Sequence, residues 1–329
     1  MMLGFILSLL PSFYFLQSTW KWPVRWGTDL RHSRLLITII SHTAFVKPNT
    51  GRKTLEYVNT QLKNIRDMCE GGLDVGVHLH TASDPKPYQH LLENGMLWCG
   101  RIGRSIKVAI FSHNLNGTDH NKALPCIARS ATWDARDAYD WFLQTEDDVD
   151  IRLSTLLEFW RVYPLVQNLL GGFRPGWVMY DRDDMFLTLT QFGAANSTAK
   201  MHSKILKDAQ GNVFFATPSY MCGFFFDRVT MEHYQRENKF VIESLNNTLF
   251  ASAPWKQEFC NGLQFSENRA IPLDSWGRLM VQHLTNKYAP DGHTGLRLKA
   301  RDFLAEWGYT YNQANDKFVK INTVQLKKG

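Results

Sequence analysis

The segment Trp141-Phe-Leu-Gln-Thr-Glu146-Asp147-Asp148-Val149-Asp150 shapes the interpretation of the whole chain. A largely apolar run of strand length comes first, and four carboxylates follow within five positions. Crowded carboxylates repel one another unless a cation or basic side chains compensate their charge. Oxygen ligands of this kind favour Mg²⁺ or Mn²⁺. The segment therefore predicts a buried strand that ends in a metal site. The alternative is a loop of solvated charges in which Asp150 caps the next helix.

Predicted strands and helices alternate on both sides of this segment. Strands are predicted at 35–41, 73–80, 106–111 and 141–145, and helices at 54–70, 124–139 and 153–170, with a loop at 47–51. Farther on, short apolar runs at 177–180, 185–189, 213–215 and 221–226 indicate strands of mixed direction, and helices are predicted at 228–239 and 255–263. The predicted fold is α/β, with a mainly parallel central sheet of Rossmann-like βαβ units and a mixed C-terminal half. Ligands of such sheets bind at the carboxyl ends of the strands.

Composition narrows the class of protein. The chain has 329 residues, of which 44% are hydrophobic and 21% charged, as expected of an ordinary globular protein. A net charge of +6 suits anionic ligands but is too small and too dispersed for nucleic-acid binding. Five cysteines without a CxxC pair indicate neither a disulfide scaffold nor a zinc site, and their pairing stays open. Eleven tryptophans suit either core packing or contacts with sugars.

The N-terminal residues predict a membrane anchor. Residues 1–20 carry no charge and are long enough to span a bilayer. Residues 21–34 are expected to form a basic linker and residues 35–329 a single domain that carries the function. Three glycosylation sequons, at Asn116, Asn196 and Asn246, agree with a single-pass protein in the lumen of the Golgi or endoplasmic reticulum. The basic residues after the apolar run favour the opposite orientation, and a signal peptide is the alternative to an anchor.

A βαβ half that ends in a buried strand and Glu146-Asp147-Asp148 resembles the GT-A glycosyltransferases, whose acidic motif is called DxD. The resemblance covers residues 35–290 in layout and is specific at 141–150. It implies Mn²⁺ or Mg²⁺ between the carboxylates and the diphosphate of a nucleotide sugar, most suitably a UDP-sugar. Asp148 would ligate the metal, Asp147 would support it, and Glu146 would face the ribose or the water shell of the metal.

The same resemblance implies further site residues. Ser41 and His80, at the ends of the first two strands, are expected to contact the nucleotide. GT-A enzymes often take a late histidine as metal ligand, for which we prefer His283 to His293. An inverting enzyme also needs a carboxylate base, for which we select Glu258 ahead of Asp274. A second acidic cluster, at residues 180–184, is the rival metal site.

Three functions compete at this point. The first is a metal-dependent glycosyltransferase that moves a sugar from a nucleotide-sugar donor to a glycan, protein or lipid acceptor in the secretory pathway. The alternative is a non-catalytic carbohydrate-binding protein on a transferase scaffold, with aromatic side chains providing the affinity. A metal-dependent phosphohydrolase would need an aspartate at the end of the first strand, where Ser41-His42 stand instead.

Overall fold

The computed structural model describes residues 33–41, 48–82, 84–93, 97–113, 124–167, 169, 174–181, 186–187, 204–217, 223–236, 269–284, 305, 308–312, 314–315 and 317–320. The predicted anchor at 1–20, the helix at 255–263 and the three sequons lie outside these residues, as do Glu258 and His293. None of the helices in the described ranges combines the length and hydropathy that a bilayer span requires.

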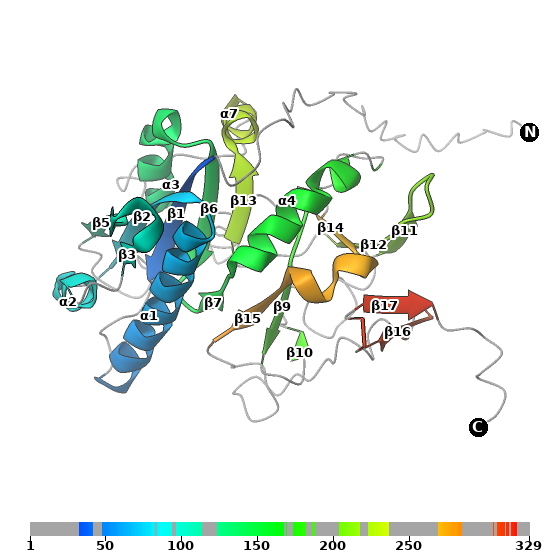
Figure 1. The fold of residues 1–329 in the computed structure, drawn as a ribbon, viewed down its shortest axis with the longest axis horizontal. Coiled ribbons are helices and arrows are strands. Elements are labelled where there is room, and N and C mark those ends of the chain that lie inside the picture. The colour runs from blue at the N-terminus through cyan, green and yellow to red at the C-terminus, as the bar shows by residue number, and fades with distance from the viewer. Residues whose placement is uncertain are drawn as a thin grey trace, which may run out of the picture.

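The central sheet has five strands in the order β13-β6-β1-β2-β5, four of them from the N-terminal half of the chain (Figure 1). Its strands are β1 (Arg34–Ser41), β2 (Asp74–Thr81), β5 (Lys107–Ser112), β6 (Trp141–Glu146) and β13 (Gly223–Asp227). The first four run parallel to one another, and β13 is antiparallel to β6. The predicted α/β class with a mainly parallel central sheet is confirmed.

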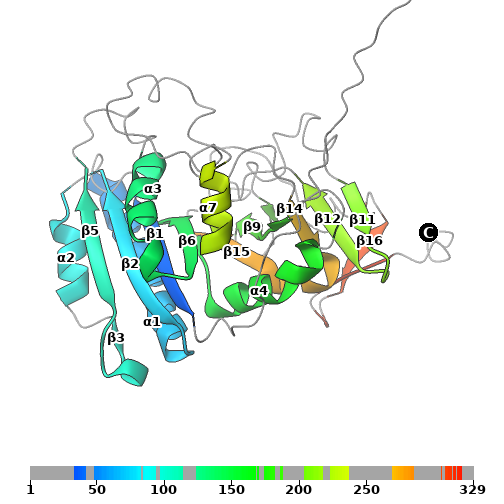
Figure 2. The same ribbon diagram turned by 90° about the horizontal axis from the view of Figure 1, so that it is seen from above.

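Helices cover both faces of this sheet, so its central strands are buried on both sides. The helices α1 (Pro48–Glu70) and α4 (Leu153–Gln167) lie on one face, and α3 (Leu124–Asp134) and α7 (Arg228–Arg236) lie on the other (Figure 2). All residues of β1 after Arg34 are buried. This double burial explains why β1 is a continuous apolar run rather than an alternating one.

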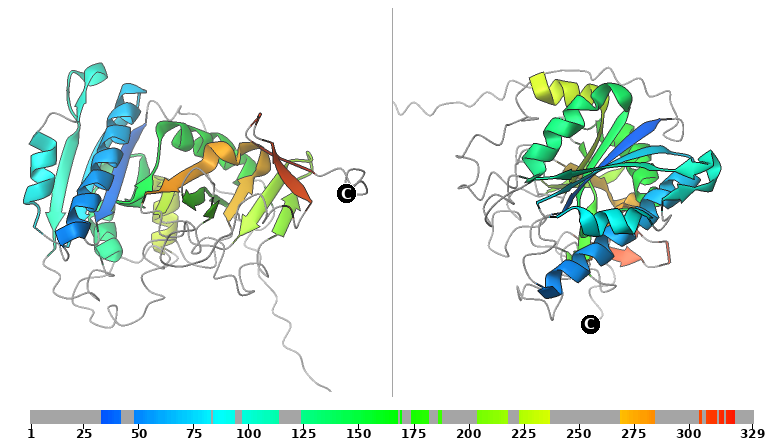
Figure 3. Two further views of the ribbon diagram at one scale, coloured as in Figure 1. Left: turned by 90° about the horizontal axis from the view of Figure 1, so that it is seen from below. Right: turned by 90° about the vertical axis from the view of Figure 1, so that its left-hand side faces the viewer.

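The second half is built from mixed sheets that continue away from β13 and α4 (Figure 3). One sheet has the order β10-β9-β15-β7 and another the order β11-β12-β14-β8. Their strands are β7 (Val149–Asp150), β8 (Arg174–Pro175), β9 (Val178–Asp181), β10 (Phe186–Leu187), β11 (Lys204–Lys207), β12 (Val213–Thr217), β14 (Arg269–Pro272) and β15 (Met280–His283). A hairpin of β16 (Tyr309–Asn312) and β17 (Lys317–Lys320) adds to them. Parallel and antiparallel pairs occur together, as predicted.

Several short elements complete the described part of the chain. These are α2 (Lys86–Glu93), β3 (Trp98–Cys99), β4 (Arg104–Ser105) and the 3-10 helices at Gly100–Ile102, Arg136–Ala138, Leu273–Ser275 and Gly277–Leu279. Several predicted boundaries differ from the structure, two of them by five or six residues. Helix α1 begins at Pro48 inside the predicted loop, because a proline fits the first helical turn. Helix α3 ends at Asp134, before the predicted end at residue 139.

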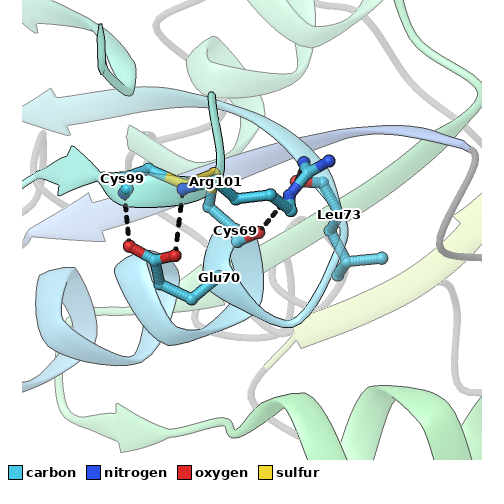
Figure 4. Close-up of a disulfide and its surroundings, with 6 residues drawn as sticks. Cys69, Glu70, Leu73, Cys99 and Arg101 are labelled. Atoms are coloured by element: carbon cyan, nitrogen blue, oxygen red, sulfur yellow. Dashed lines mark hydrogen bonds between the residues drawn. A yellow bond between two sulfur atoms is a disulfide. The ribbon is translucent and has the colours of Figure 1, made fainter. Parts of the chain in front are cut away.

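A disulfide between Cys69 and Cys99 joins the last turn of α1 to β3, with the two Cα atoms 6.2 Å apart. The Glu70 carboxylate accepts the backbone N–H groups of Gly100, at 2.5 Å, and Arg101, at 3.2 Å (Figure 4). The Arg101 side chain donates in return to the Cys69 carbonyl at 2.7 Å. Covalent and polar contacts therefore hold the β3–β4 hairpin against the end of α1.

Candidate functional site

The carboxyl ends of β1, β2 and β6 lie side by side at one edge of the central sheet. Ser41 pairs with Thr81 of β2, and Ile40 pairs with Glu146 at the end of β6. Ligands of parallel α/β sheets bind at this edge. The Glu146-Asp147-Asp148 motif therefore begins where a ligand site is expected.

Asp147 anchors the acidic motif to β1. Its backbone N–H donates to the Ile40 carbonyl at 3.0 Å, and its Oδ2 accepts the Ser41 hydroxyl at 2.5 Å. Because the Ser41 proton is used in this bond, the Tyr88 hydroxyl donates to Ser41 Oγ, at 2.7 Å. Burial raises the pKa of Asp147 well above its usual range, and the adjacent Asp148 raises it further. The Asp147 side chain is therefore buried, and its bonds to β1 fix the position of the acidic motif.

Asp148 meets His283, which is 135 residues away in the sequence. Strand β15 runs antiparallel to β7, with His283 opposite Val149, and the backbone N–H of Leu284 donates to the Asp148 carbonyl at 2.7 Å. His283 Nε2 lies 3.1 Å from Asp148 Oδ2. The side chains are 2% and 13% exposed, respectively. Two residues selected as metal ligands thus lie together, and their ligand role remains a prediction.

The chemistry of this pair suits a divalent cation. His283 Nε2 and Asp148 Oδ2 are at hydrogen-bond distance, 3.1 Å, which is also about the spacing of neighbouring ligands of an octahedral ion bound at 2.0–2.1 Å. Within the described ranges, no three His, Cys, Asp or Glu side chains gather closely enough to hold a metal ion. Glu146 is thus not assembled with the pair. Asp148 and His283 would serve as two protein ligands, and oxygens of a diphosphate and water would complete the coordination.

A row of polar side chains on α1 faces the acidic motif. Gln61 Nε2 donates to the backbone carbonyl of Glu146 at 2.5 Å, and Asn64 Nδ2 donates to the carboxylate that ends β7, also at 2.5 Å. Burial raises the pKa of Tyr57, and the Asp148 carboxylate raises it further, so this phenol lies near the motif. Spacings of four and three place Tyr57, Gln61 and Asn64 on one helix face. Sequence reasoning used only the apolar positions of this helix and missed the polar row.

Asp150 does not cap the following helix. Its carboxylate accepts Asn64 Nδ2 and is held by Arg152, whose Nη2 lies 2.8 Å from Asp150 Oδ2. The residue is itself the last of β7, three positions before α4 begins at Leu153. An acidic residue just before a helix often caps it, but here Asp150 pairs with Gln282 of β15 and its carboxylate accepts a hydrogen bond from Asn64 of α1.

His80 lies at the same edge of the sheet, on the face opposite to Ser41. It is paired with Ile40, which packs against α3, and is fully buried on that face of the sheet. His80 Nδ1 lies 3.0 Å from His113 Nε2 with the rings almost coplanar, and Phe111 stacks on the His80 ring. Burial and the neighbouring imidazoles lower the pKa of His80 to about 3. Ile40 also pairs with Glu146, so His80 lies level with the first residue of the motif, two strands away, and its ring contacts His113 and Phe111. Its contact with a nucleotide remains a prediction.

The remaining selected residues are apart from the motif or outside the described ranges. Asp274 is exposed in the 3-10 helix at Leu273–Ser275, and Arg278 donates to its backbone carbonyl at 3.5 Å. Glu258 lies outside the described residues, and so do residues 182–185 of the rival acidic cluster. Within that cluster, Tyr180 of β9 pairs with Gln282, the residue before His283.

Comparisons with known proteins give structural likeness alone. No family model matches the chain, and no curated protein matches it in sequence. CMP:2-keto-3-deoxy-manno-octonic acid synthetase complexed with CTP is similar with a TM-score of 0.35 and 11% identity, over 84% of this chain and 96% of that one. The glycosyltransferase GlyE of Streptococcus pneumoniae TIGR4 has a TM-score of 0.34 and 11% identity, over 84% of this chain and 60% of GlyE. A putative nucleotide-diphospho-sugar transferase of Desulfovibrio desulfuricans G20 has a TM-score of 0.25 and 10% identity, over 46% of this chain and 59% of that one. The function of this chain is therefore inferred from its own site residues.

Proposed function

We propose that the protein is a metal-dependent glycosyltransferase that uses a nucleotide-sugar donor, most suitably a UDP-sugar, and a glycan, protein or lipid acceptor. One observation carries the proposal. Asp148 of the acidic motif and His283 converge to 3.1 Å directly beyond the carboxyl ends of a parallel sheet. Carboxylate and imidazole ligands at that edge suit Mn²⁺ or Mg²⁺ with a diphosphate.

The residues around the pair have distinct roles in this proposal. Asp148 and His283 hold the cation, which when bound compensates the charge that develops on the departing nucleoside diphosphate. Asp147 and Ser41 hold the turn in place, so that the pair is preorganised before the donor arrives. Glu146 faces the ribose or the water shell of the cation. For an inverting reaction, Glu258 is the preferred base and Asp274 the second choice.

The secretory pathway is the proposed compartment. The Cys69–Cys99 disulfide supports it, because disulfides persist in oxidising compartments and are rare in the cytosol. The anchor at residues 1–20 and the three sequons are part of the same proposal. A glycosidase-sensitive mobility shift of protein that resists carbonate extraction is expected. Unglycosylated, carbonate-extractable protein would contradict the membrane and lumenal assignment.

Donor hydrolysis and binding test the activity. The purified chain is assayed with UDP- and GDP-sugars in Mn²⁺, in Mg²⁺ and in EDTA, and donor binding is followed by calorimetry. Turnover is expected only with metal, and Asp148→Asn should lower it by about 100-fold or more. Asp67→Asn, an exposed change on α1, is the matched control and should keep wild-type turnover. Full activity of the Asp148 variant would refute the site. Glycan binding without turnover of any donor would favour the non-catalytic alternative.

A further inference from the structure

A cavity of about 150 Å³ opens at the opposite edge of the central sheet, where its strands begin. Its lining includes Arg34 and Asp74, which start β1 and β2, Lys107, which starts β5, and both residues of β4. Ser41 lies seven positions after Arg34 in β1, which corresponds to about 23 Å along a strand. The cavity is therefore separate from the Asp148–His283 pair.

The charge of the cavity is positive. Arg104 and Lys107 are exposed, and neither forms an ion pair with another residue in the described ranges. Arg34 is compensated by Asp140, at 3.4 Å, and Asp74 is the one carboxylate of the lining. Two available cations against one carboxylate leave a site that attracts an anion.

Tyr139 adds a hydrogen-bond donor to these cations. Its phenol lies across Gly76, where a Cβ atom would collide with the hydroxyl group, so the glycine makes this position possible. The hydroxyl makes no hydrogen bond within the described residues, and it belongs to the lining of the cavity. Burial, aided by Asp74, raises the pKa of Tyr139, so the group keeps its proton at neutral pH. A phenol proton and two cations complement the several acceptor oxygens of an oxyanion.

An exposed tryptophan lies beside the cavity. Trp98 of β3 is 53% exposed and is paired with Ser105 of β4, a residue of the cavity wall. Directly opposed residues of an antiparallel pair have their side chains on the same face. The disulfide at Cys99 holds this hairpin in place. An apolar indole surface next to an anion site suits a ligand that has both a charged group and a ring.

We propose that this cavity binds a sulfate or phosphate group carried by a sugar, with the sugar ring resting on Trp98. The volume of about 150 Å³ suits one charged group, because pockets for whole drug-sized ligands begin at about 300 Å³. The site would hold an acidic sugar far from the place of transfer. It does not depend on the proposed transferase activity.

Calorimetry with the full chain tests the proposal, with glucose 6-sulfate, glucose 6-phosphate, glucose and inorganic sulfate as probes. Both esters are expected to bind and glucose is not, and the tighter ester identifies the natural group. Arg104→Ala with Lys107→Ala should weaken ester binding by at least about tenfold. Trp98→Ala should weaken the binding of the esters and leave that of inorganic sulfate unchanged.

Lys204→Ala with Lys207→Ala is the matched control, because it removes the same charge from β11, which lies at the far end of the molecule (Figure 1). This variant should bind the esters like the wild type. Asp148→Asn should also bind them like the wild type, so ester binding can be judged separately from the proposed transferase activity. Equal losses in the β11 control, or unchanged binding in the Arg104/Lys107 variant, would overturn the site. Ester binding that is unchanged in Trp98→Ala would overturn the sugar ligand.

Discussion

Acidification is expected to destabilise the protein through His80. This imidazole is fully buried between the sheet and α3, donates to or accepts from His113 at 3.0 Å, and stacks on Phe111. A second proton on His80 would place a charge in this apolar layer and leave two N–H groups to be satisfied. Burial first, and His113 and His78 after it, therefore lower the pKa of His80 to about 3.

The magnitude follows from the two pKa values. The group has a pKa of 6.5 when unperturbed and about 3 in the folded protein. Between these values the unfolded chain binds a proton that the folded chain does not, so stability falls as the pH falls below 6.5 and stops falling near pH 3. The full difference corresponds to roughly 5 kcal/mol, of which about 2 kcal/mol is lost between about pH 7.5 and pH 5.

Urea unfolding at a series of pH values measures this loss in the wild type and in His80→Asn. The asparagine keeps a polar atom near the position of Nδ1, and its smaller volume lowers stability equally at all pH values. The variant should therefore lose about 2 kcal/mol less than the wild type between about pH 7.5 and pH 5. The matched control is His90→Asn, an exposed change on α2, which should follow the wild type. Parallel pH profiles of wild type and His80→Asn would refute the reasoning.

Three further outcomes are expected. Replacing Cys69 and Cys99 together by serine should lower the free energy of unfolding by about 3–4 kcal/mol, because the disulfide spans 30 residues. Equal urea midpoints under non-reducing conditions would contradict this. Ser41→Ala removes the hydroxyl that donates to buried Asp147, which should cost about 1–3 kcal/mol in the same assay. Gly223→Ala should lower the melting temperature by several degrees, because Gly223 has a φ of +153° and its Cβ would meet the backbone of β6. A melting temperature equal to that of the wild type would show that β13 adjusts freely.

The central sheet follows from local patterns in the sequence. The run at 35–41 and the strand at 141–145 are apolar almost without interruption, and strands buried on both faces have this pattern. Glycines and polar residues separate them from helices with apolar positions at helical spacing. These signals act over a few residues, so the predicted strands differ from β1 and β6 by one residue at one end and from β2 and β5 by one residue at both ends.

Strand ends were also predictable, but the direction of their side chains was not. Ser41 and His80 both mark polar ends, yet Ser41 contacts Asp147 and Tyr88 while His80 faces α3. Successive side chains of a strand point to opposite faces, so the register places Ser41 beside Asp147 and places His80 on the other face, with Ile40 and Glu146. That register depends on the packing of α1 and α3.

The convergence of distant residues is decided by the tertiary structure. Nothing local to His283 shows that β15 will pair with β7 and place the imidazole beside Asp148, because pairing depends on a sheet assembled from separated segments. The same holds for Cys69 and Cys99, two of five cysteines whose pairing the sequence left open until α1 and β3 were packed together. Local propensity specifies strands and helices over a few residues, whereas the site and the disulfide require contacts made only when the complete core has formed.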